Sequence, residues 1–517
     1  MAEKNYGSYD YIIAGAGAAG CVIATRLVTN TNGKVLLLEA GGAVINVPSM
    51  EAPTKWVHNI GSEVDYQFEY APSPLLNNRA IPLACGKILG GGGSINGMLF
   101  ARGHQMDYDG WSKAGNTGWD YQSVLPLFTK MEMWEGGQSA WHGAHGSIRV
   151  ERAKELHITD TAFIEAAKSF GMPYLADSNV PSPEGVGPES MNVRDGRRCS
   201  SATAYLKPLM YAGKENLTVL TGAKVLKLNF SGTRCTGLSF MVKDRSYSAD
   251  VTGEVILSAG AINTPRVLML SGVGPQAELT RLGIPVVANL PGVGQNFQDH
   301  PMACGVCFEA NRLLPPPNNN LGGSLAFWKS RKEFASPDLM FLNIQVPFVT
   351  PAIAAKYSPS PNSFVITPSL VRPQSRGYVR MKTARHDGPM EIQPNFLSEK
   401  ADREALIDAV EIALQIAEQP AFKAIVKSRV APAPLDPLDR SSIMEFLKDA
   451  CNSYNHPVGT CAMGTGSDSV VNSRLQVNGI AGLRIADASI MPTITSANTF
   501  APSVMIGEFA SRVITGK

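Results

Sequence analysis

Charge of either sign is scarce in this chain. Of its 517 residues, 46 are basic and 44 acidic, which leaves a formal net charge of +2. This balance gives no reason to expect nucleic acid, an anionic membrane or another polyanion as a partner. A charged fraction of 17% beside an apolar fraction of 44% indicates a globular protein. The length favours two domains over one.

Long apolar runs are also missing. No uninterrupted stretch approaches the roughly 18 residues that a membrane-spanning helix needs, so we expect no membrane span. The polar start of the chain lacks the basic and then apolar segments of a secretory signal. Its eight cysteines are scattered, as is typical of free thiols in a reducing compartment. We therefore expect a cytoplasmic protein.

The motifs of several enzyme classes do not occur. Cys304 and Cys307 form a C-x-x-C without the second pair or matching histidines that a zinc site would need. We interpret them as two buried thiols on one strand. There is no Gly-x-Ser-x-Gly and no His-Glu-x-x-His. The sequence thus predicts no metal site and gives no support to a hydrolase or a zinc peptidase.

Glycine, by contrast, is plentiful, and its first cluster has a recognisable spacing. Gly15, Gly17 and Gly20 form G-x-G-x-x-G between an apolar strand expected at 9–14 and a helix expected at 18–29. The three glycines suit a tight turn, a close approach to a pyrophosphate and close helix–strand packing. A second strand expected at 34–39 ends in Glu39, whose carboxylate would accept from ribose hydroxyls and disfavour NADP. The motif predicts a dinucleotide site but does not separate NAD from FAD.

The rest of the chain mixes helices with strands. Segments 160–170, 401–418 and 502–514 have the pattern of helices, and segments 217–230, 235–243 and 254–258 that of strands. From 301 to 393 the pattern is strand-like and punctuated by proline, which favours a mostly antiparallel sheet. No segment has the composition of a long linker, so we expect two domains interleaved in sequence.

Further blocks follow in a fixed order. They are rich in glycine, asparagine, aspartate, histidine and proline, and lie at residues 86–97, 260–274, 291–301, 455–460, 486–489 and 498–499. Their order and spacing, from residue 9 to residue 511, resemble the signatures of the glucose–methanol–choline (GMC) oxidoreductases. The four successive glycines at 90–93 would let the backbone lie against a large flat ligand. The resemblance covers essentially the whole chain and implies FAD.

The resemblance implies an α/β fold with two interleaved domains. A Rossmann-type FAD-binding domain would comprise residues 1–155, 195–300 and 465–517. A substrate domain, built on a mostly antiparallel sheet with helices, would comprise 156–194 and 301–464.

The resemblance also implies which residues hold FAD. Residues 96–99 would run beside the isoalloxazine, Val225 would hold the adenine through its backbone, and Asp487 would lie near the ribityl and pyrophosphate groups. Some relatives attach the flavin through a histidine at the place of Ile95, so we predict non-covalent FAD here. The full predicted set is Gly15, Gly17, Ala18, Gly20, Glu39, Ala40, Gly86, Gly91, Gly92, Asn96, Gly97, Met98, Leu99, Val225, Asn455, Asp487, Ala488 and Thr499.

Oxidation of an alcohol needs a base within reach of its hydroxyl proton, and the chain has only eight histidines. His456 lies in the block that the family places over the flavin, and we predict that it is the base. Asn498 would be its partner at the substrate oxygen. His300 is interpreted as a buried polar support. His142 and His145 lie in a glycine- and tryptophan-rich loop and are expected at the surface or in a lid.

The predicted activity is oxidation of a small primary alcohol, aromatic alcohols included, with hydride transfer to flavin N5. Oxygen or another electron acceptor would reoxidise the cofactor. A hydroxynitrile lyase-like enzyme that holds FAD without redox work, and a non-catalytic flavin-binding protein, remain alternatives. Oxidase and dehydrogenase are not separated, and the oligomeric state stays open. Four aromatic residues could line the substrate pocket or belong to the core: Phe341, Phe348, Phe364 and Tyr454.

Overall fold

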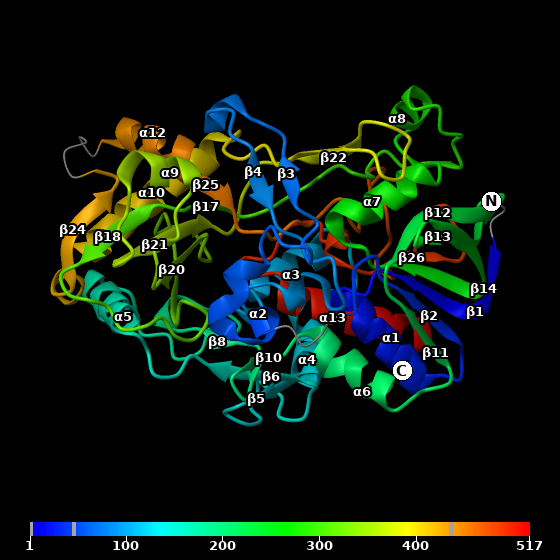
Figure 1. The fold of residues 1–517 in the computed structure, drawn as a ribbon, viewed down its shortest axis with the longest axis horizontal. Helices are drawn as coiled ribbons and strands as arrows, with labels where there is room; N and C mark the ends of the chain where they lie inside the picture. The colour runs from blue at the N-terminus through cyan, green and yellow to red at the C-terminus, as the bar shows by residue number, and fades with distance from the viewer. Residues whose placement is uncertain (1–3, 44–47, 434–438, 517) are drawn as a thin grey trace.

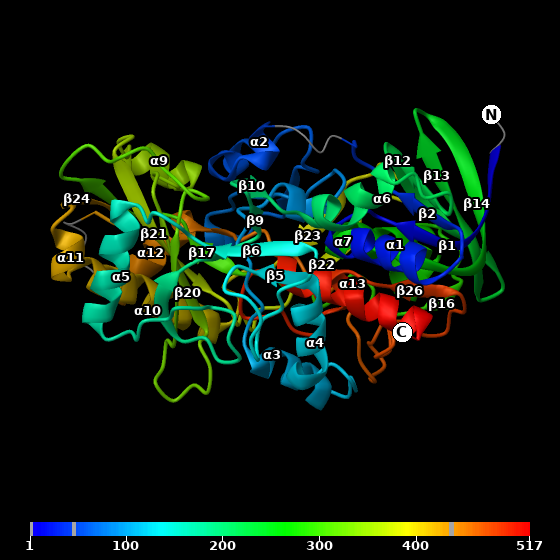
Figure 2. The ribbon, with the colours of Figure 1, turned by 90° about the horizontal axis from the view of Figure 1, so that it is seen from below.

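The computed structural model describes residues 4–43, 48–433 and 439–516. Two sheets lie toward opposite ends of the long axis of the molecule, and both views separate them (Figures 1 and 2). The chain passes between the two parts several times, as the mixing of colours in each half makes visible (Figure 1). Two large clusters of buried apolar side chains accompany this division.

The first sheet has seven strands and a parallel centre. The expected strand–helix–strand unit opens it, with β1 (Lys4–Ala14), α1 (Ala18–Asn30) and β2 (Val35–Leu38). Strand β1 pairs in parallel with β2 and β14, while β12, β13 and β14 form an antiparallel ribbon. The order is β11-β2-β1-β14-β13-β12 with β26 beside β14, where the added strands are β11 (Leu217–Leu220), β12 (Ala223–Ser231), β13 (Arg234–Val242), β14 (Arg245–Leu257) and β26 (Leu483–Ile485).

The second sheet has eight strands, and every pairing within it is antiparallel, as the sequence pattern predicts. This sheet joins segments that are far apart in sequence: β7, at residues 185–188, pairs with β19, at residues 324–328. Its strands are β7 (Gly185–Pro188), β17 (Pro301–Ala303), β18 (Val306–Ala310), β19 (Ser324–Trp328), β20 (Leu339–Ile344), β21 (Ser363–Leu370), β24 (Val426–Ala431) and β25 (Cys451–Ser453).

Helices cover both sheets. α1 packs on the C-terminal helix α13 (Phe500–Thr515), and α10 (Lys400–Ala417) packs on β21 and on α5 (Ile158–Phe170). The other helices are α2 (Pro48–Glu51), α3 (Gln105–Lys113), α4 (Tyr121–Met131), α6 (Lys207–Tyr211), α7 (Gly260–Leu270), α8 (Gln276–Arg281), α9 (Pro351–Tyr357), α11 (Pro420–Lys423) and α12 (Arg440–Ala450). No helix in the described ranges is both long and apolar enough to cross a bilayer.

Five smaller sheets complete the pairings of the described residues. They are β3 (Phe68–Tyr70) with β4 (Ile81–Leu83), β5 (Glu132–Trp134) with β6 (Ile148–Arg152) and β8 (Ser190–Met191), β9 (Val193–Arg194) with β10 (Arg197–Arg198), β15 (Val273–Gly274) with β16 (Ala288–Asn289), and β22 (Tyr378–Met381) with β23 (Met390–Gln393).

Three local predictions need correction. The strand expected at 217–230 is broken between β11 and β12, where Gly222 turns the chain with φ of +65°. Cys304 and Cys307 are both buried free thiols, but only Cys307 lies on a strand. His142 is not a surface or lid residue: it is buried and bridges Glu132 at 2.9 Å and Asp177 at 2.6 Å.

Some segments of the two predicted domains can be placed on the two sheets. Strand β7 and helix α5, from 156–194, lie on the second sheet, and β26, from 465–517, lies on the first. The exact boundaries stay a prediction. Between the two sheets lies a cavity that residues of both sheets line.

Candidate active site

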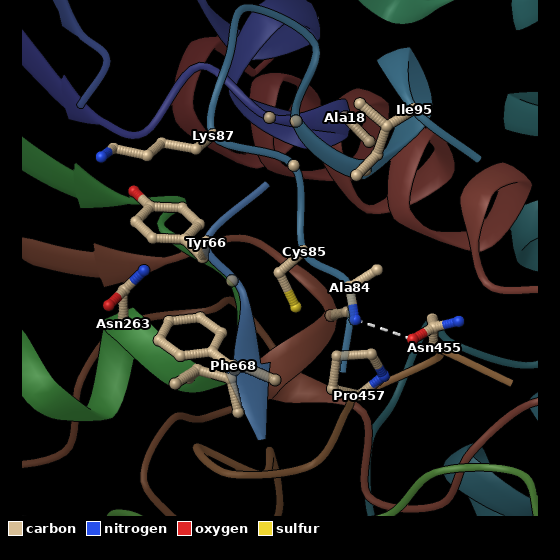
Figure 3. Close-up of a pocket in the computed structure, with 18 of the residues that line it drawn as sticks. Ala18, Tyr66, Phe68, Ala84, Cys85, Lys87, Ile95, Asn263, Asn455 and Pro457 are labelled. Atoms are coloured by element: carbon tan, nitrogen blue, oxygen red, sulfur yellow. Dashed lines mark hydrogen bonds between the residues drawn. The ribbon is translucent and has the colours of Figure 1, made fainter. Parts of the chain in front are cut away.

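One cavity of about 690 Å³ takes its walls from both parts of the molecule. Its size falls within the roughly 300–1,000 Å³ usual for ligand pockets. Figure 3 shows part of its wall, where Ala18 and Lys87 lie toward one side and Asn455 and Pro457 toward another. All the predicted site residues line it except Gly20.

The turn between β1 and α1 forms one end of this cavity. Gly15 has φ of +106°, and a Cβ there would collide with the carbonyl of Ser258. A Cβ on Gly20 would collide with the carbonyl of Gly15, so Gly20 serves the packing of helix against turn. The cavity is lined by Gly17 and Ala18, where α1 begins and where its first N–H groups are free to bind an anion.

Glu39 follows β2 at the same end. Its two carboxylate oxygens accept from the backbone N–H of Ala16 at 3.0 Å and of Gly41 at 2.8 Å. Burial raises the pKa of Glu39 to about 7. The side chain thus ties the glycine turn to the end of β2, beside Ala40 in the cavity wall.

The second glycine cluster packs against the first. A Cβ on Gly91, whose φ is +54°, would lie only 2.9 Å from Cα of Gly17. A Cβ on Gly92 would meet nothing within 4 Å, although Gly92 lines the cavity. Its missing side chain therefore leaves room in the cavity itself, as a cradle for a flat ligand requires.

Cationic side chains gather at this end. Lys87, Lys224 and Arg266 line the cavity, and the pKa of Lys224 is lowered by burial and by the charges of the other two. Arg266 also donates to the carbonyls of His386 at 2.6 Å and Gly388 at 2.8 Å, which holds the β22–β23 loop against the cavity. A ligand with negative charge is favoured here.

Asp487 lines the cavity, but its carboxylate is occupied by protein donors. It accepts from the N–H of Gly260 at 2.9 Å, the N–H of Ser489 at 2.8 Å and the hydroxyl of Thr264 at 2.6 Å. Burial raises its pKa. Asp487 thus fixes the start of α7 and shapes the wall.

The segment after the second glycine cluster continues the wall. It includes Asn96, Gly97, Met98 and Leu99, with Ile95 beside them. Further lining comes from Val225 on β12 and from Gly86, Ala488 and Thr499. Asn455 has φ of +62° and accepts from the N–H of Ala84 at 2.8 Å, the bond drawn in Figure 3.

His456 and Asn498 meet at the other end of the cavity, although 42 positions separate them in sequence. Nδ2 of Asn498 lies 3.2 Å from Nε2 of His456, and Nδ1 of His456 lies 3.0 Å from Nδ1 of His300. The ring of Tyr454 stacks on His456, with 4.5 Å between centroids. These contacts fix the imidazole on three sides.

The hydrogen bonds also favour one tautomer of His456. An amide nitrogen facing Nε2 matches a lone pair there, so Nδ1 of His456 carries the hydrogen and donates to His300. Burial lowers the pKa of His456 well below its usual value, with a further contribution from His300, and lowers the pKa of His300 to about 3. His456 is therefore neutral at neutral pH and able to accept a proton at Nε2.

Asp299 supports this arrangement from behind. Its carboxylate accepts from the backbone N–H groups of His300 and His456, each at 2.8 Å, and from the hydroxyls of Tyr70 and Ser453. The interpretation of His300 as a buried polar support therefore agrees with its contacts. The two histidines are brought together by the antiparallel pairing of β17 with β25, in which Pro301 lies opposite Ser453. Next to this pairing, the N–H of Tyr454 donates to the carbonyl of His300 at 3.0 Å.

The lining around the histidines is apolar. It includes Trp56, Met302, Leu342, Ile344, Phe348 and Tyr454. Phe341 and Phe364 are fully buried in the second cluster and do not line the cavity. The liners contributed by β17, β20 and β21 carry no charge.

Several lining residues escaped the sequence analysis. Tyr66 and Phe68 stack at 5.2 Å, and Figure 3 places them beside Cys85 and Asn263. Arg198, which contacts the wall from behind, was also missed. No motif in the sequence singled out the aromatic side chains of Tyr66 and Phe68.

Two family models match this chain, and both describe GMC oxidoreductases. The GMC oxidoreductase N-terminal model matches residues 9–302 and the C-terminal model matches residues 373–507. The chain belongs to the GMC oxidoreductase family. Its architecture is therefore the GMC fold, and the oxidoreductase assignment follows from the family itself.

Individual relatives cover nearly the whole chain. Mitochondrial choline dehydrogenase of Homo sapiens is 35% identical over 98% of this chain and 90% of its own length. Alcohol dehydrogenase [acceptor] of Pseudomonas putida is 35% identical over 98% of this chain and 96% of its own. The crystal structure of pyridoxine 4-oxidase from Mesorbium loti superimposes with a TM-score of 0.93 at 29% identity, covering 97% of this chain and 98% of that one.

The residues present fit the FAD that this family binds. The open space at Gly92, the free amides at the start of α1 and the cations at the same end suit a flat ring joined to a pyrophosphate. No group of three or more His, Cys, Asp or Glu side chains that could hold a metal ion occurs among the described residues.

Proposed function

We propose that this protein oxidises an uncharged primary alcohol, aromatic alcohols included, to the aldehyde with FAD as cofactor. The observation that carries the proposal is the His456–Asn498 pair at the apolar end of a cavity whose other end fits a dinucleotide. FAD, when bound, accepts the hydride that leaves the alcohol carbon.

The cofactor would be held without a covalent bond. Ile95 lines the cavity at the place where some relatives carry the linking histidine, and its side chain offers no nucleophile. Gly17, Ala18 and Gly92 would receive the pyrophosphate and ring system, and Glu39 would receive ribose hydroxyls. Acid or heat should then release FAD into the supernatant.

His456 would take the hydroxyl proton at Nε2. Its Nδ1–H would donate to His300, which leaves the acceptor lone pair on Nε2, where the amide of Asn498 lies in this structure. Asn498 would donate an amide hydrogen to the same substrate oxygen and stabilise the negative charge that develops there. The apolar lining would exclude water and so strengthen both interactions.

The lining also supports an uncharged substrate. Glu189 is close enough to the cavity liner Tyr454 for its charge to raise the pKa of that tyrosine, yet Glu189 itself does not line the cavity. Burial raises the pKa of Glu189 to about 8, so it is protonated at neutral pH and offers no anion to a quaternary ammonium group. Among the relatives, the names alcohol dehydrogenase and pyridoxine 4-oxidase agree better with such a site than choline dehydrogenase does.

A panel of alcohols tests this proposal. Benzylic and short primary alcohols should be oxidised, and choline should be a poorer substrate. Each would be run with oxygen and separately with an artificial acceptor: peroxide would indicate an oxidase, and dye reduction without peroxide a dehydrogenase. Cleavage of cyanohydrins with no oxidation of any alcohol would overturn the proposal in favour of a lyase. A coloured protein that oxidises no alcohol would favour a non-catalytic flavin protein.

A further inference from the structure

A buried guanidinium lies directly behind the cavity wall. Arg198, at the end of β10, donates from Nη1 to Oδ1 of Asn96 at 2.6 Å and to the carbonyl of Gly93 at 3.2 Å. Its Nε donates to the carbonyl of Met50 at 2.6 Å. Asn96 and Gly93 both line the cavity, so one residue separates this cation from the space that FAD would fill.

No acid balances this charge. Arg198 forms no ion pair with any described residue, and its Nη2 is buried with no hydrogen-bond partner. Its neighbour Arg197 is exposed and pairs instead with Glu51 at 3.3 Å. Arg102 provides the contrast within the same chain, because this second buried guanidinium is paired with Glu132.

The charge nevertheless persists. Burial lowers the pKa of Arg198 to about 9, which leaves the guanidinium protonated at neutral pH. An uncompensated buried cation is strongly unfavourable, and neutral carbonyl and amide partners offset only part of its lost hydration. A negative charge supplied by a ligand would compensate it.

We propose that Arg198 stabilises the negative charge that bound FAD gains on reduction. A hydride carries two electrons and one proton, so the ring system that receives it becomes one unit more negative until a second proton arrives. Asn96, which Arg198 holds, begins the segment that would run beside the isoalloxazine. Arg198 thus acts on the cofactor through space and through Asn96, without contact with the alcohol.

This inference rests on the proposed function only in requiring bound FAD. Its test is the reduction potential of the bound cofactor, measured by equilibration with reference dyes and without any alcohol. A failure here therefore leaves alcohol oxidation untouched, and a protein without alcohol activity can still be tested.

Arg198→Gln removes the charge and keeps polar atoms for Gly93 and Asn96. We expect the equilibrium constant for reduction to fall about ten- to a hundredfold, a two-electron potential about 30–60 mV lower. Arg102→Gln is the matched control, because it also removes a buried guanidinium: it should lower stability and leave the potential unchanged.

Arg198→Lys keeps the test decisive if Arg198→Gln loses the cofactor. A lysine buried there has a lowered pKa, so the potential should match the parent at low pH and fall below it as the lysine loses its proton with rising pH. An Arg198→Lys potential well below the parent's at low pH, where the lysine is charged, or an Arg198→Gln potential equal to the parent's, would overturn the proposal and leave Arg198 a purely structural support.

Discussion

The two ends of the cavity are built on different principles. At the end formed by α1 and the glycine clusters, recognition comes from backbone: the geometry depends on the absence of side chains at Gly15, Gly91 and Gly92. At the opposite end it comes from side chains, where His456 is held by His300, Asn498 and Tyr454.

This difference predicts how each end responds to change. A substitution at the glycine end alters whether the cofactor fits, whereas a substitution at the histidine end alters the chemistry of a cofactor that stays bound. If variants at the two ends failed in the same way, this division between cofactor binding and chemistry would be wrong.

The largest effect should follow removal of the base. His456→Ala should slow reduction of the cofactor by alcohol about 10²–10⁴-fold, the usual contribution of a general base, and the protein should remain yellow. The rate is measured by anaerobic rapid mixing. His145→Ala is the control, because His145 is exposed and should not change the rate. A His456→Ala rate within threefold of the parent would contradict the assignment.

A smaller effect is expected at the glycine end. Gly92→Ala should weaken FAD binding at least tenfold, or about 1.4 kcal/mol, because the added methyl projects into the cavity and meets no protein atom. The apoprotein should unfold at the parent's temperature. Gly110→Ala, an exposed helical glycine in α3 that also has open space around it, should leave FAD binding unchanged. Equal affinity of Gly92→Ala and the parent, by fluorescence titration, would speak against the cradle.

Tyr454 offers a graded test of the histidine end. Tyr454→Phe keeps the ring on His456 and removes a buried hydroxyl that faces Asn498 but makes no close hydrogen bond with a described residue, so the rate should stay within threefold. Tyr454→Leu removes the ring, and we expect a loss of about 0.5–1.5 kcal/mol, or roughly two- to tenfold in rate. FAD retention should not change in either variant. Loss of FAD from Tyr454→Leu would show that the histidine end also determines cofactor binding, which contradicts the division between the two ends.

The smallest effect concerns pH: near neutral pH, kcat/KM should hardly change with pH. The base must be neutral, and burial lowers the pKa of His456 well below its usual value. Activity is therefore complete above this lowered pKa and is lost only as the pH falls through it. A profile of kcat/KM should be flat from about pH 6.5, the usual histidine pKa, to pH 8. If kcat/KM already declined on acidification from pH 8 to pH 7, neutral His456 with its lowered pKa would not be the base.

The glycine end was the easier one to predict from sequence. A glycine at +106° or a missing Cβ has a local cause, and the G-x-G-x-x-G spacing encodes it directly. The antiparallel character of the second sheet was also readable, from alternation and proline between 301 and 393.

Tertiary contacts account for what the sequence did not reveal. Nothing near His142 indicates Glu132 and Asp177 as partners that bury it. The break at Gly222 has an ambiguous signal, since glycine also occurs within strands. The pairing of His456 with Asn498 came from family resemblance, and the stacking of Tyr454 and the unpaired charge of Arg198 depend on neighbours from distant segments.

The central claim is that a flavin lies beside an imidazole able to take an alcohol's proton. Its most direct test is an anaerobic titration of the purified yellow protein with one accepted alcohol. We predict that one equivalent of alcohol per flavin bleaches the long-wavelength absorbance and yields one equivalent of aldehyde. Protein that stays colourless after reconstitution with FAD, or flavin absorbance that does not change while every alcohol is left intact, would contradict the account.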